Sequence, residues 1–308
     1  MPRRPSPLGQ DVPPVFTVAE ALRHGIHPSR LVRSDLRAPY PGLRVRAGAP
    51  EPMTLLERCR EYAPRIRPWQ FYSHETALFL HGAPLPEGRR IAELHVSAHR
   101  PAREPRIAGV VGHRLQMRES AVVMVNGMPV ENPVRAWRQA ATRWRADDLV
   151  AAADFLVSGS APLARVGDLH DEIMKMGDVR GGILRRALSD VRVGPRSPRE
   201  TRLRLLLVRA GMPEPEITWN LTDARGLFVA ELDLAYPTWR VTPEYDGRVH
   251  AESAAQFAKD ADRWERIRAE GWDHVRVLNH HMAGGGIRAV AMVRRALTAA
   301  GWRPGDPA

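Results

Sequence analysis

Acidic residues recur at two-residue spacing in the last third of this 308-residue chain. Glu231 and Asp233 lie in one apolar run, and Glu244 and Asp246 lie in the next, so each strand would present two carboxylates on one face. Acids at facing positions of neighbouring central strands repel each other and are costly to bury. Mg²⁺ relieves that cost, because it binds one or two carboxylates together with water and substrate phosphate. The pattern favours a metal site able to neutralise a phosphoryl transition state.

The same acids have a second interpretation that needs no metal. They would then lie at strand ends in solvent, or pair with Arg240 and Arg248, which flank Glu244 in the sequence. We expect the strand of Asp233 to pair with the strand of Glu244 in a hairpin, which brings the acids together.

A third acid, Glu200, opens the segment that leads into these strands. In the motif at 197–200, Ser197 is a typical helix cap, Pro198 suits the first turn, and Glu200 completes a capping box. The helix that follows ends at Gly211. Alternating patterns and turn residues then predict, in order, strands over 216–221, 228–235 and 240–245, a long helix over 254–271 and a strand over 275–278.

These motifs together resemble the DUF559 domain, a relative of the very-short-patch mismatch-repair endonuclease in the PD-(D/E)XK nuclease superfamily. The shared motifs are Ser-Pro-x-Glu (197–200), Ala-Gly-x-Pro (210–213), Glu-Leu-Asp-Leu-Ala-Tyr-Pro (231–237), Glu-Tyr-Asp-Gly-x-x-His (244–250), Asp-x-x-Arg (260–263), Gly-Trp (271–272) and Val-Arg-Val (275–277). The resemblance covers the whole of residues 197–278 in order, and it implies a restriction-endonuclease-like α/β fold.

The resemblance also implies roles for particular residues. Asp233 and Glu244 would be ligands of Mg²⁺ or Mn²⁺, and Glu200 would be the accessory acid that completes the metal site or positions water. Asp246 stands where the superfamily often has a catalytic lysine. His250 follows where the mismatch-repair relatives use histidine for acid–base work, and a histidine titrates near neutral pH.

Two features depart from the expected nuclease pattern. Because Asp246 occupies the lysine position, Lys259 on the predicted long helix is a candidate for a relocated lysine, the alternative being a solvated helix residue. Pro243 precedes Glu244 where the family usually has an aliphatic residue. Proline removes a ladder hydrogen bond from a strand, so an edge, a bulge or a displaced Glu244 is expected there.

The first 50 residues carry a cluster of arginines. Thr17 and Glu20 predict a capped helix, and Pro28 opens a second helix that would present three arginines on one face. A turn and a short basic strand follow, which completes the outline of a winged helix-turn-helix. The alternative is a solvated basic face on a small helical cap. The candidate residues for DNA contact are Arg30, Arg33, Arg37 and Arg44.

A second resemblance covers part of the first two thirds of the chain. Residues 16–42 resemble the N-terminal winged helix of AbiEi-type antitoxins, which belong to type IV toxin–antitoxin systems. Residues 73–77, the Leu-His-Gly that follows and residues 129–137 resemble the mixed α+β region found beside that winged helix. The resemblance implies DNA binding by the first 50 residues and a toxin or other defence partner.

Three histidines, His74, His95 and His113, are scattered through the middle region. Their separations lack the tight spacing of a metal-binding motif. We interpret them as packing or loop residues, with metal ligation as the alternative.

The charge is basic and unevenly distributed. The net charge is +11, and Lys175 and Lys259 are the only lysines. Residues 1–50 carry eight arginines against three acids, whereas residues 197–308 carry 16 basic and 15 acidic residues. A basic excess is typical of proteins with a polyanionic partner, the alternative being arginine enrichment from a GC-rich genome.

Composition excludes several other classes of protein. Cys59 is the single cysteine, which excludes a disulfide framework and a cysteine-based zinc site. No apolar run approaches the ~18 residues of a membrane span, and the first residues lack the apolar core of a signal peptide. We therefore expect a soluble cytoplasmic protein with no membrane partner.

The expected fold is mixed α/β. It comprises a winged helix-turn-helix at 1–50, an α+β middle domain at 51–196 and a nuclease-like domain at 197–308. The leading hypothesis is a DNA-binding, metal-dependent endonuclease. One alternative is a non-catalytic antitoxin or repressor with a degenerate nuclease fold, and another is an interaction module that does not contact DNA.

Overall fold

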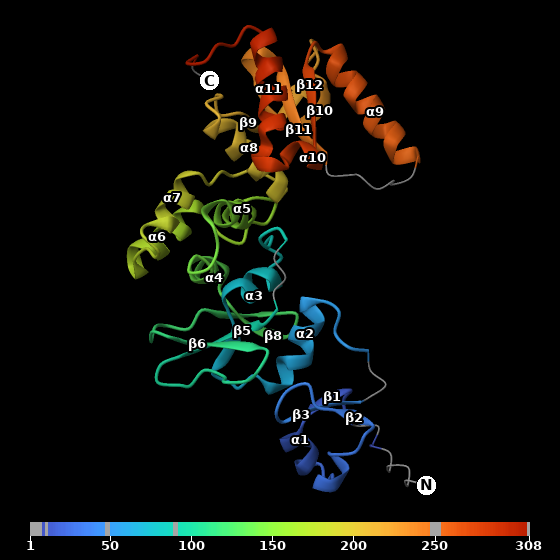
Figure 1. The fold of residues 1–308 in the computed structure, drawn as a ribbon, viewed down its shortest axis with the longest axis vertical. Helices are drawn as coiled ribbons and strands as arrows, with labels where there is room; N and C mark the ends of the chain where they lie inside the picture. The colour runs from blue at the N-terminus through green and yellow to red at the C-terminus, as the bar shows by residue number, and fades with distance from the viewer. Residues whose placement is uncertain (1–7, 10–11, 47–49, 89–91, 247–253, 307–308) are drawn as a thin grey trace. The chain divides into compact units, whose positions relative to one another are not determined.

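The computed structural model describes the chain except for residues 1–7, 10–11, 47–49, 89–91, 247–253 and 307–308 (Figure 1). The protein is mixed α/β with several separate sheets, and it divides into two compact units, residues 1–140 and 141–308. The division falls inside the expected middle domain, because α5 (Ala146–Val157) packs against α8 (Pro198–Arg209) of the second unit. No helix in the described part is long and apolar enough to cross a membrane.

The first unit begins with a small three-stranded sheet and one capped helix. The order of strands is β1 (Val15–Thr17), β3 (Leu43–Arg46) and β2 (Leu36–Arg37). The predicted capping box of α1 (Val18–Arg23) is confirmed: the N–H of Glu20 donates to Thr17 Oγ1 at 3.1 Å, and the N–H of Thr17 donates to Glu20 Oε2 at 2.9 Å.

The predicted second, basic helix is wrong. The chain forms only a 3₁₀ turn at Pro28–Arg30 and re-enters the sheet at β2. Arg30 makes two hydrogen bonds with Asp35, of 2.8 and 2.6 Å, which close the intervening turn. Arg37 lies in a strand, with Val45 as its cross-strand neighbour, so the three arginines do not share a helix face.

The rest of the first unit is built on a five-stranded sheet. Its strands, in spatial order, are β6 (Val110–Leu115), β5 (Leu94–His99), β4 (Gln70–Tyr72), β8 (Met128–Glu131) and β7 (Val122–Val125). The helices of this part are α2 (Leu55–Tyr62), α3 (His74–Leu80) and α4 (Pro133–Ala140), with a 3₁₀ turn at Ala63–Arg65. Helix α3 packs on β5 and α4, and Trp137 is fully buried.

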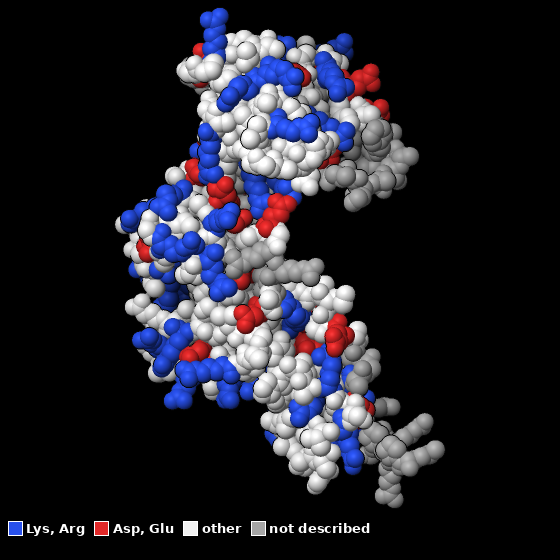
Figure 2. Space-filling model, viewed as in Figure 1, with Lys and Arg blue, Asp and Glu red and all other residues white. Residues whose placement is uncertain are grey.

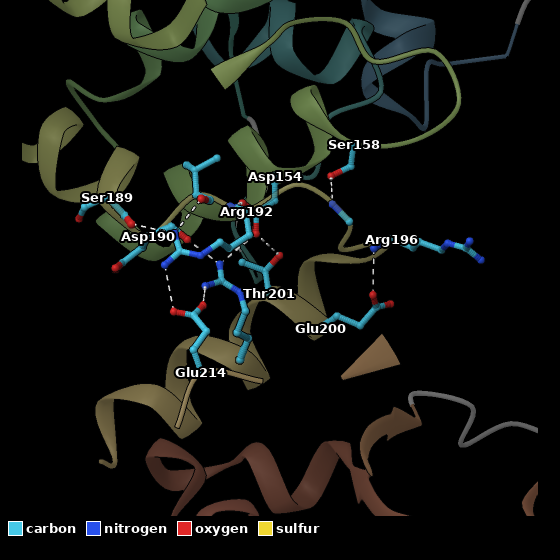
Figure 3. Close-up of polar contacts among 12 residues, drawn as sticks. Asp154, Ser158, Ser189, Asp190, Arg192, Arg196, Glu200, Thr201 and Glu214 are labelled. Carbon is cyan, nitrogen blue, oxygen red and sulfur yellow. Dashed lines mark hydrogen bonds and ion pairs between the residues drawn. The ribbon is translucent and has the colours of Figure 1, made fainter. Parts of the chain in front are cut away.

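The second unit starts with three helices and a buried ionic network (Figure 3). The helices are α5, α6 (Val166–Met176) and α7 (Ile183–Ser189). Arg204 of α8 is 1% exposed and pairs with Asp154 of α5 at 3.3 Å and with Glu214 at 2.9 Å. Asp154 also accepts from the Thr201 hydroxyl at 2.9 Å, so α8 is tied to α5 by polar contacts that no water reaches.

A strand layer follows, covered by helices on both faces (Figure 1). Its strands are β9 (Glu216–Thr222), β10 (Phe228–Ala235), β11 (Val241–Asp246) and β12 (Asp273–Leu278), with a 3₁₀ turn at Pro237–Trp239. The helices are α9 (Ala254–Ala269), α10 (Asn279–Met282) and α11 (Ile287–Ala299), with a 3₁₀ turn at Gly284–Gly286. Leu203 of α8, Val277 of β12 and Val293 of α11 share one apolar cluster; Leu232 of β10 and Ile267 of α9 share the other.

Pairing within this layer differs from the expected hairpin. Strand β10 is antiparallel to β9, and β11 is parallel to β12; β10 and β11 share one bridge, at Tyr236 and Val241. Pro243 lies at the position that would face Leu234 if this pairing continued. Because proline has no N–H, the Leu234 carbonyl instead accepts from the Thr242 hydroxyl at 2.8 Å. The proline ends the β10–β11 ladder without removing Glu244 from its strand.

Candidate active site: an acidic cavity in the second unit

A cavity of about 640 Å³ opens where β10 and β11 meet the start of α8 and the side of α9. Five carboxylates line it, from three elements: Glu200 of α8, Glu231 and Asp233 of β10, and Glu244 and Asp246 of β11. The predicted acids therefore do converge on one cavity, although β10 and β11 are not a continuous hairpin. Three of the five, Glu231, Glu244 and Asp246, form ion pairs with arginine side chains.

Asp233 is the acid with the least compensation. Burial, together with the charges of Glu200 and Glu244, raises the pKa of its carboxyl to about 7, and the charge of Arg263 lowers it only in part. Among the residues that the structure describes, none donates a hydrogen bond to Asp233. A carboxylate in this position is costly to ionise, and a bound cation would remove that cost.

Glu200 is positioned by the start of its own helix. Its N–H donates to the Ser197 hydroxyl at 3.2 Å, as the cap prediction requires. Its carboxylate does not return to the Ser197 N–H to complete the capping box; it accepts from the N–H of Arg196 at 2.9 Å, as Figure 3 shows. The side chain of Glu200 is thereby held at the cavity wall, where its charge helps to raise the pKa of Asp233.

Glu244 is compensated by two cationic or hydrogen-bonding neighbours. His274 Nε2 lies 3.0 Å from its Oε2, and Arg263 Nη1 donates to both of its oxygens at 2.9 and 2.7 Å. Burial alone would raise the pKa of Glu244, but these partners outweigh it and hold the pKa below its usual value. Glu244 is therefore ionised and rigidly placed, not displaced by Pro243.

Asp246 forms an ion pair in place of the expected solvent contact. The Arg276 side chain of β12 donates to its Oδ2 from Nε at 2.7 Å and approaches with Nη2 at 2.5 Å. The same guanidinium lies over the Trp264 ring, 4.5 Å from its centre. Asp246 therefore acts as an anchor for Arg276 at the cavity wall. Arg240, one of the alternative partners, does not pair with Glu244 or Asp246, and Arg248 lies outside the described residues.

Two predicted site residues are not tested by the geometry. His250 lies outside the described residues. Lys259 lies in α9, and its side chain is likewise outside the described part of the chain.

The expected DNA-contacting arginines are largely engaged in internal contacts. Arg30 pairs with Asp35, Arg37 pairs with Glu61, and Arg44 donates to the carbonyl oxygens of Leu31 at 2.5 Å and Leu43 at 2.7 Å. Arg33 is exposed, which leaves it as the member of the set best placed for an external phosphate. Figure 2 shows further arginine and lysine side chains over the visible face of both units.

The arginine and histidine partners of Glu244 are the functional residues that sequence reasoning placed least well. Arg263 stood out only as the end of an Asp-x-x-Arg motif, with Asp260 or the site itself as possible partners. The structure pairs it with Glu244 and with the Glu231 carbonyl oxygen at 2.7 Å. Arg276 belonged to the Val-Arg-Val motif of the resemblance, next to His274, but nothing local in the sequence indicated the acid that either residue contacts, because each partner lies 30 residues earlier in the chain.

The closest grouping of potential metal ligands lies elsewhere. In the described part of the chain, the one set of three such residues with ligand atoms all within 4.8 Å of one another is His74, His95 and His113, in the first unit. The carboxylates of the second unit instead line an open cavity, and the charges of Glu200 and Glu244 raise the pKa of Asp233 there.

Comparison of the chain with protein-family models, curated proteins and solved structures found no match. The function is therefore argued from the site geometry and from the motifs described above.

Proposed function

We propose that the second unit binds a divalent metal ion at Glu200, Asp233 and Glu244 and hydrolyses phosphodiester bonds in DNA, as the resemblance to the DUF559 domain and to the very-short-patch repair endonuclease implies. The observation that carries the proposal is the convergence of these three carboxylates on one cavity. They come from α8, β10 and β11, which are separate elements that only the fold brings together. In this proposal the protein acts on DNA in the cytoplasm.

The donor set fits Mg²⁺ or Mn²⁺. Both ions prefer carboxylate oxygen and retain water and phosphate as further ligands. Asp233 and Glu200 would hold the ion, and Glu244, kept ionised by Arg263 and His274, would supply the third carboxylate. When bound, such an ion activates water and neutralises charge on a phosphoryl group.

Basic side chains at the cavity suit a phosphate backbone. Arg199 lies 5.2 Å from the centre of the Tyr245 ring, and Arg196 and Arg266 also line the cavity. Arg196 is 65% exposed and pairs with Glu231, so its guanidinium is held at the surface beside the acids. Arginines around an acidic centre would orient a DNA strand over the metal ligands.

A plasmid-nicking assay on the full chain tests the proposal. With Mg²⁺ or Mn²⁺, the wild type should nick supercoiled DNA, and EDTA should abolish nicking. Asp233→Asn and Glu244→Gln should each lower the rate by about 100-fold or more, because each removes a carboxylate that would hold the metal ion.

Asp171→Asn is the matched control. It removes one carboxylate of the same unit from a side chain that is 84% exposed on α6, so the rate should stay at the wild-type value. Nicking that is equal in wild type, Asp233→Asn and Glu244→Gln, or absent from all of them, would exclude the nuclease proposal.

A second candidate is a non-catalytic DNA-binding regulator of antitoxin or repressor type, as the resemblance of the first 50 residues to AbiEi-type antitoxins implies. The observation that favours it is the neutralisation of the site by its own arginines: Arg263 is bound to Glu244 and Arg276 to Asp246. DNA binding that persists in EDTA, without cleavage under any metal, would support this candidate over the first.

A further inference from the structure

Three histidines of the first unit meet at one position, although they are far apart in the sequence. His95 and Ser97 lie on β5, and parallel pairing with β6 sets Ser97 opposite His113, so all three side chains share one face of the sheet. His74 begins α3, directly after Ser73, whose N–H donates to the His95 carbonyl oxygen at 3.0 Å. The strand order thus places two histidines side by side and the third at the helix start above them.

The contacts of His95 select which of its nitrogens faces the cluster. Glu75 Oε1 lies 3.0 Å from His95 Nε2, and both side chains are nearly fully buried. A carboxylate there accepts the Nε2 proton, which leaves the lone pair of the neutral ring on Nδ1. That Nδ1 lies 2.9 Å from His113 Nε2. A carboxylate behind a histidine is the arrangement that orients metal-binding imidazoles and raises their basicity.

His74 is held in place by independent constraints. Its ring stacks on that of His113 with centroids 3.7 Å apart, and its Nδ1 lies 2.9 Å from Ser73 Oγ, which in turn accepts from Ser97 Oγ at 2.6 Å. Its backbone has a φ of 52°, in the left-handed region that side chains other than glycine rarely adopt. Such strain is retained where surrounding contacts over-determine the conformation, and it concentrates at functional positions.

We propose that His74, His95 and His113 form a binding site for a divalent transition metal ion, of which Zn²⁺ is the best match. Their ligand nitrogens all lie within 4.8 Å of one another. Neutral imidazole is a preferred ligand of Zn²⁺, whereas Mg²⁺ prefers oxygen, so this site and the acidic cavity select different ions.

Zn²⁺ binding would replace the contact between His95 Nδ1 and His113 Nε2 with a bond from each nitrogen to the ion. Two nitrogens on one tetrahedral Zn²⁺ lie about 3.3 Å apart, given Zn–N bonds of about 2.05 Å. The His95–His113 separation of 2.9 Å must widen by about 0.4 Å. His113 loses the proton on Nε2 and takes one up on Nδ1 from solvent, so that a neutral ring presents Nε2 to the ion. The His74 ring tilts out of its stack on His113, because an imidazole nitrogen donates in the plane of its ring. His113 is half-buried and supplies the freedom for the widening, while Glu75 and Thr76 keep His95 in place.

The test is metal binding by the full-length protein, freed of metal with EDTA and then desalted. Zn²⁺ is titrated by calorimetry, and Co²⁺ by its visible absorption, which reports imidazole coordination directly. All titrations use the Asp233→Asn background, so that ions held by the acidic cavity do not contribute and the result is independent of the proposed nuclease function. One Zn²⁺ should bind per chain, and the Zn²⁺ complex should melt at a higher temperature than the metal-free protein.

Variants of the cluster decide the assignment. His113→Ala, at the half-buried position, and His95→Ala should each weaken Zn²⁺ binding by about 100-fold or more, and Glu75→Gln should weaken it by about 10-fold or more. His99→Ala, on the same strand but outside the cluster, should bind Zn²⁺ as the parent does.

If His95→Ala does not fold, His113→Ala and the Co²⁺ spectrum still give a decision. The proposal is overturned if the parent binds no Zn²⁺, if His113→Ala binds it as tightly as the parent, or if the bound Co²⁺ spectrum shows oxygen ligands only.

Discussion

At the scale of single residues, the environment of Asp233 separates it from every other acid of the cavity. Glu244 has Arg263 and His274, Asp246 has Arg276, Glu231 has Arg196, and Glu200 accepts from the Arg196 N–H, whereas Asp233 faces mainly other carboxylates. A residue whose charge is disfavoured by its own fold is a candidate for function, because that cost is retained only where a ligand or a reaction uses it.

This environment predicts a pH-dependent cost to stability in the absence of metal. The pKa of Asp233 is about 7 in the folded protein and near 3.8 when unfolded, so the cost of ionising it is absent below pH 4, grows as the pH rises toward 7 and is fully present above that. In EDTA at pH 8, Asp233→Asn should be more stable than the wild type by about 2–4 kcal/mol, and the difference should disappear near pH 4. Urea denaturation at the two pH values measures both.

Mg²⁺ supplies the control for this prediction. At pH 8 it should raise the melting temperature of the wild type and leave that of Asp233→Asn unchanged. A wild type that is as stable as Asp233→Asn at pH 8 in EDTA would show that the Asp233 carboxylate carries no such cost.

At the scale of elements, α8 is the part of the fold on which the site depends. It is capped by Ser197, carries Glu200 in its first turn, and is tied to α5 by the Arg204–Asp154 pair. Both side chains of that pair are 1% exposed. Removing one partner from a buried ion pair leaves an uncompensated charge, whereas an exposed pair contributes little.

Two substitutions on α8 compare these cases directly. Arg204→Met should lower the free energy of unfolding by about 3–5 kcal/mol, because Asp154 and Glu214 lose their buried partner. Arg209→Met is the matched control: its partners Asp147 and Asp190 are 46% and 39% exposed, and the cost should be about 1 kcal/mol or less. Urea denaturation at pH 7 measures both. Similar costs for the two variants would mean that the buried network does not stabilise α8.

At the scale of the whole molecule, the net charge of +11 lies mainly in the first unit: residues 1–140 carry 21 basic and 12 acidic residues, whereas residues 141–308 carry 25 and 23. Many of the positive charges are used in internal ion pairs: Arg30 pairs with Asp35, Arg37 with Glu61 and Arg263 with Glu244. The charge available to a partner is therefore smaller than the composition indicates, and it resides on exposed arginines such as Arg33.

The proposed DNA binding should accordingly be moderate in its salt dependence. If four arginines contact phosphates, the affinity measured by fluorescence anisotropy in EDTA should fall about 100-fold between 50 and 200 mM KCl. Arg33→Ala should reduce the slope of log K against log salt by about 1.

Arg30→Ala provides the contrast within the same segment. Because Arg30 pairs with Asp35, its removal should lower the melting temperature and leave the salt slope at the wild-type value. An affinity that does not change with salt would rule out phosphate contacts altogether.

The local elements were predictable from the chain itself. The Thr17–Glu20 capping box, the helix that starts at Pro198 and the strand over Phe228–Ala235 depend on residues within a few positions of one another, and the structure confirms them. The basic helix after Pro28 failed for a related reason. The pattern of arginines fits a helix, but the Arg30–Asp35 contact and the pairing of Leu36 with Arg46 compete with it and win.

Sequence alone thus determined the mixed α/β class, the main strands and helices of the second unit and the acids that line its cavity. Only the tertiary structure decided what surrounds those side chains. The arginine that neutralises Glu244 comes 19 residues later, Asp233 has no such partner among the residues that the structure describes, and three histidines spread over 40 residues meet at one point. Charge, pKa and metal affinity depend on distances through space, and those distances are set by packing between elements, which no local pattern records.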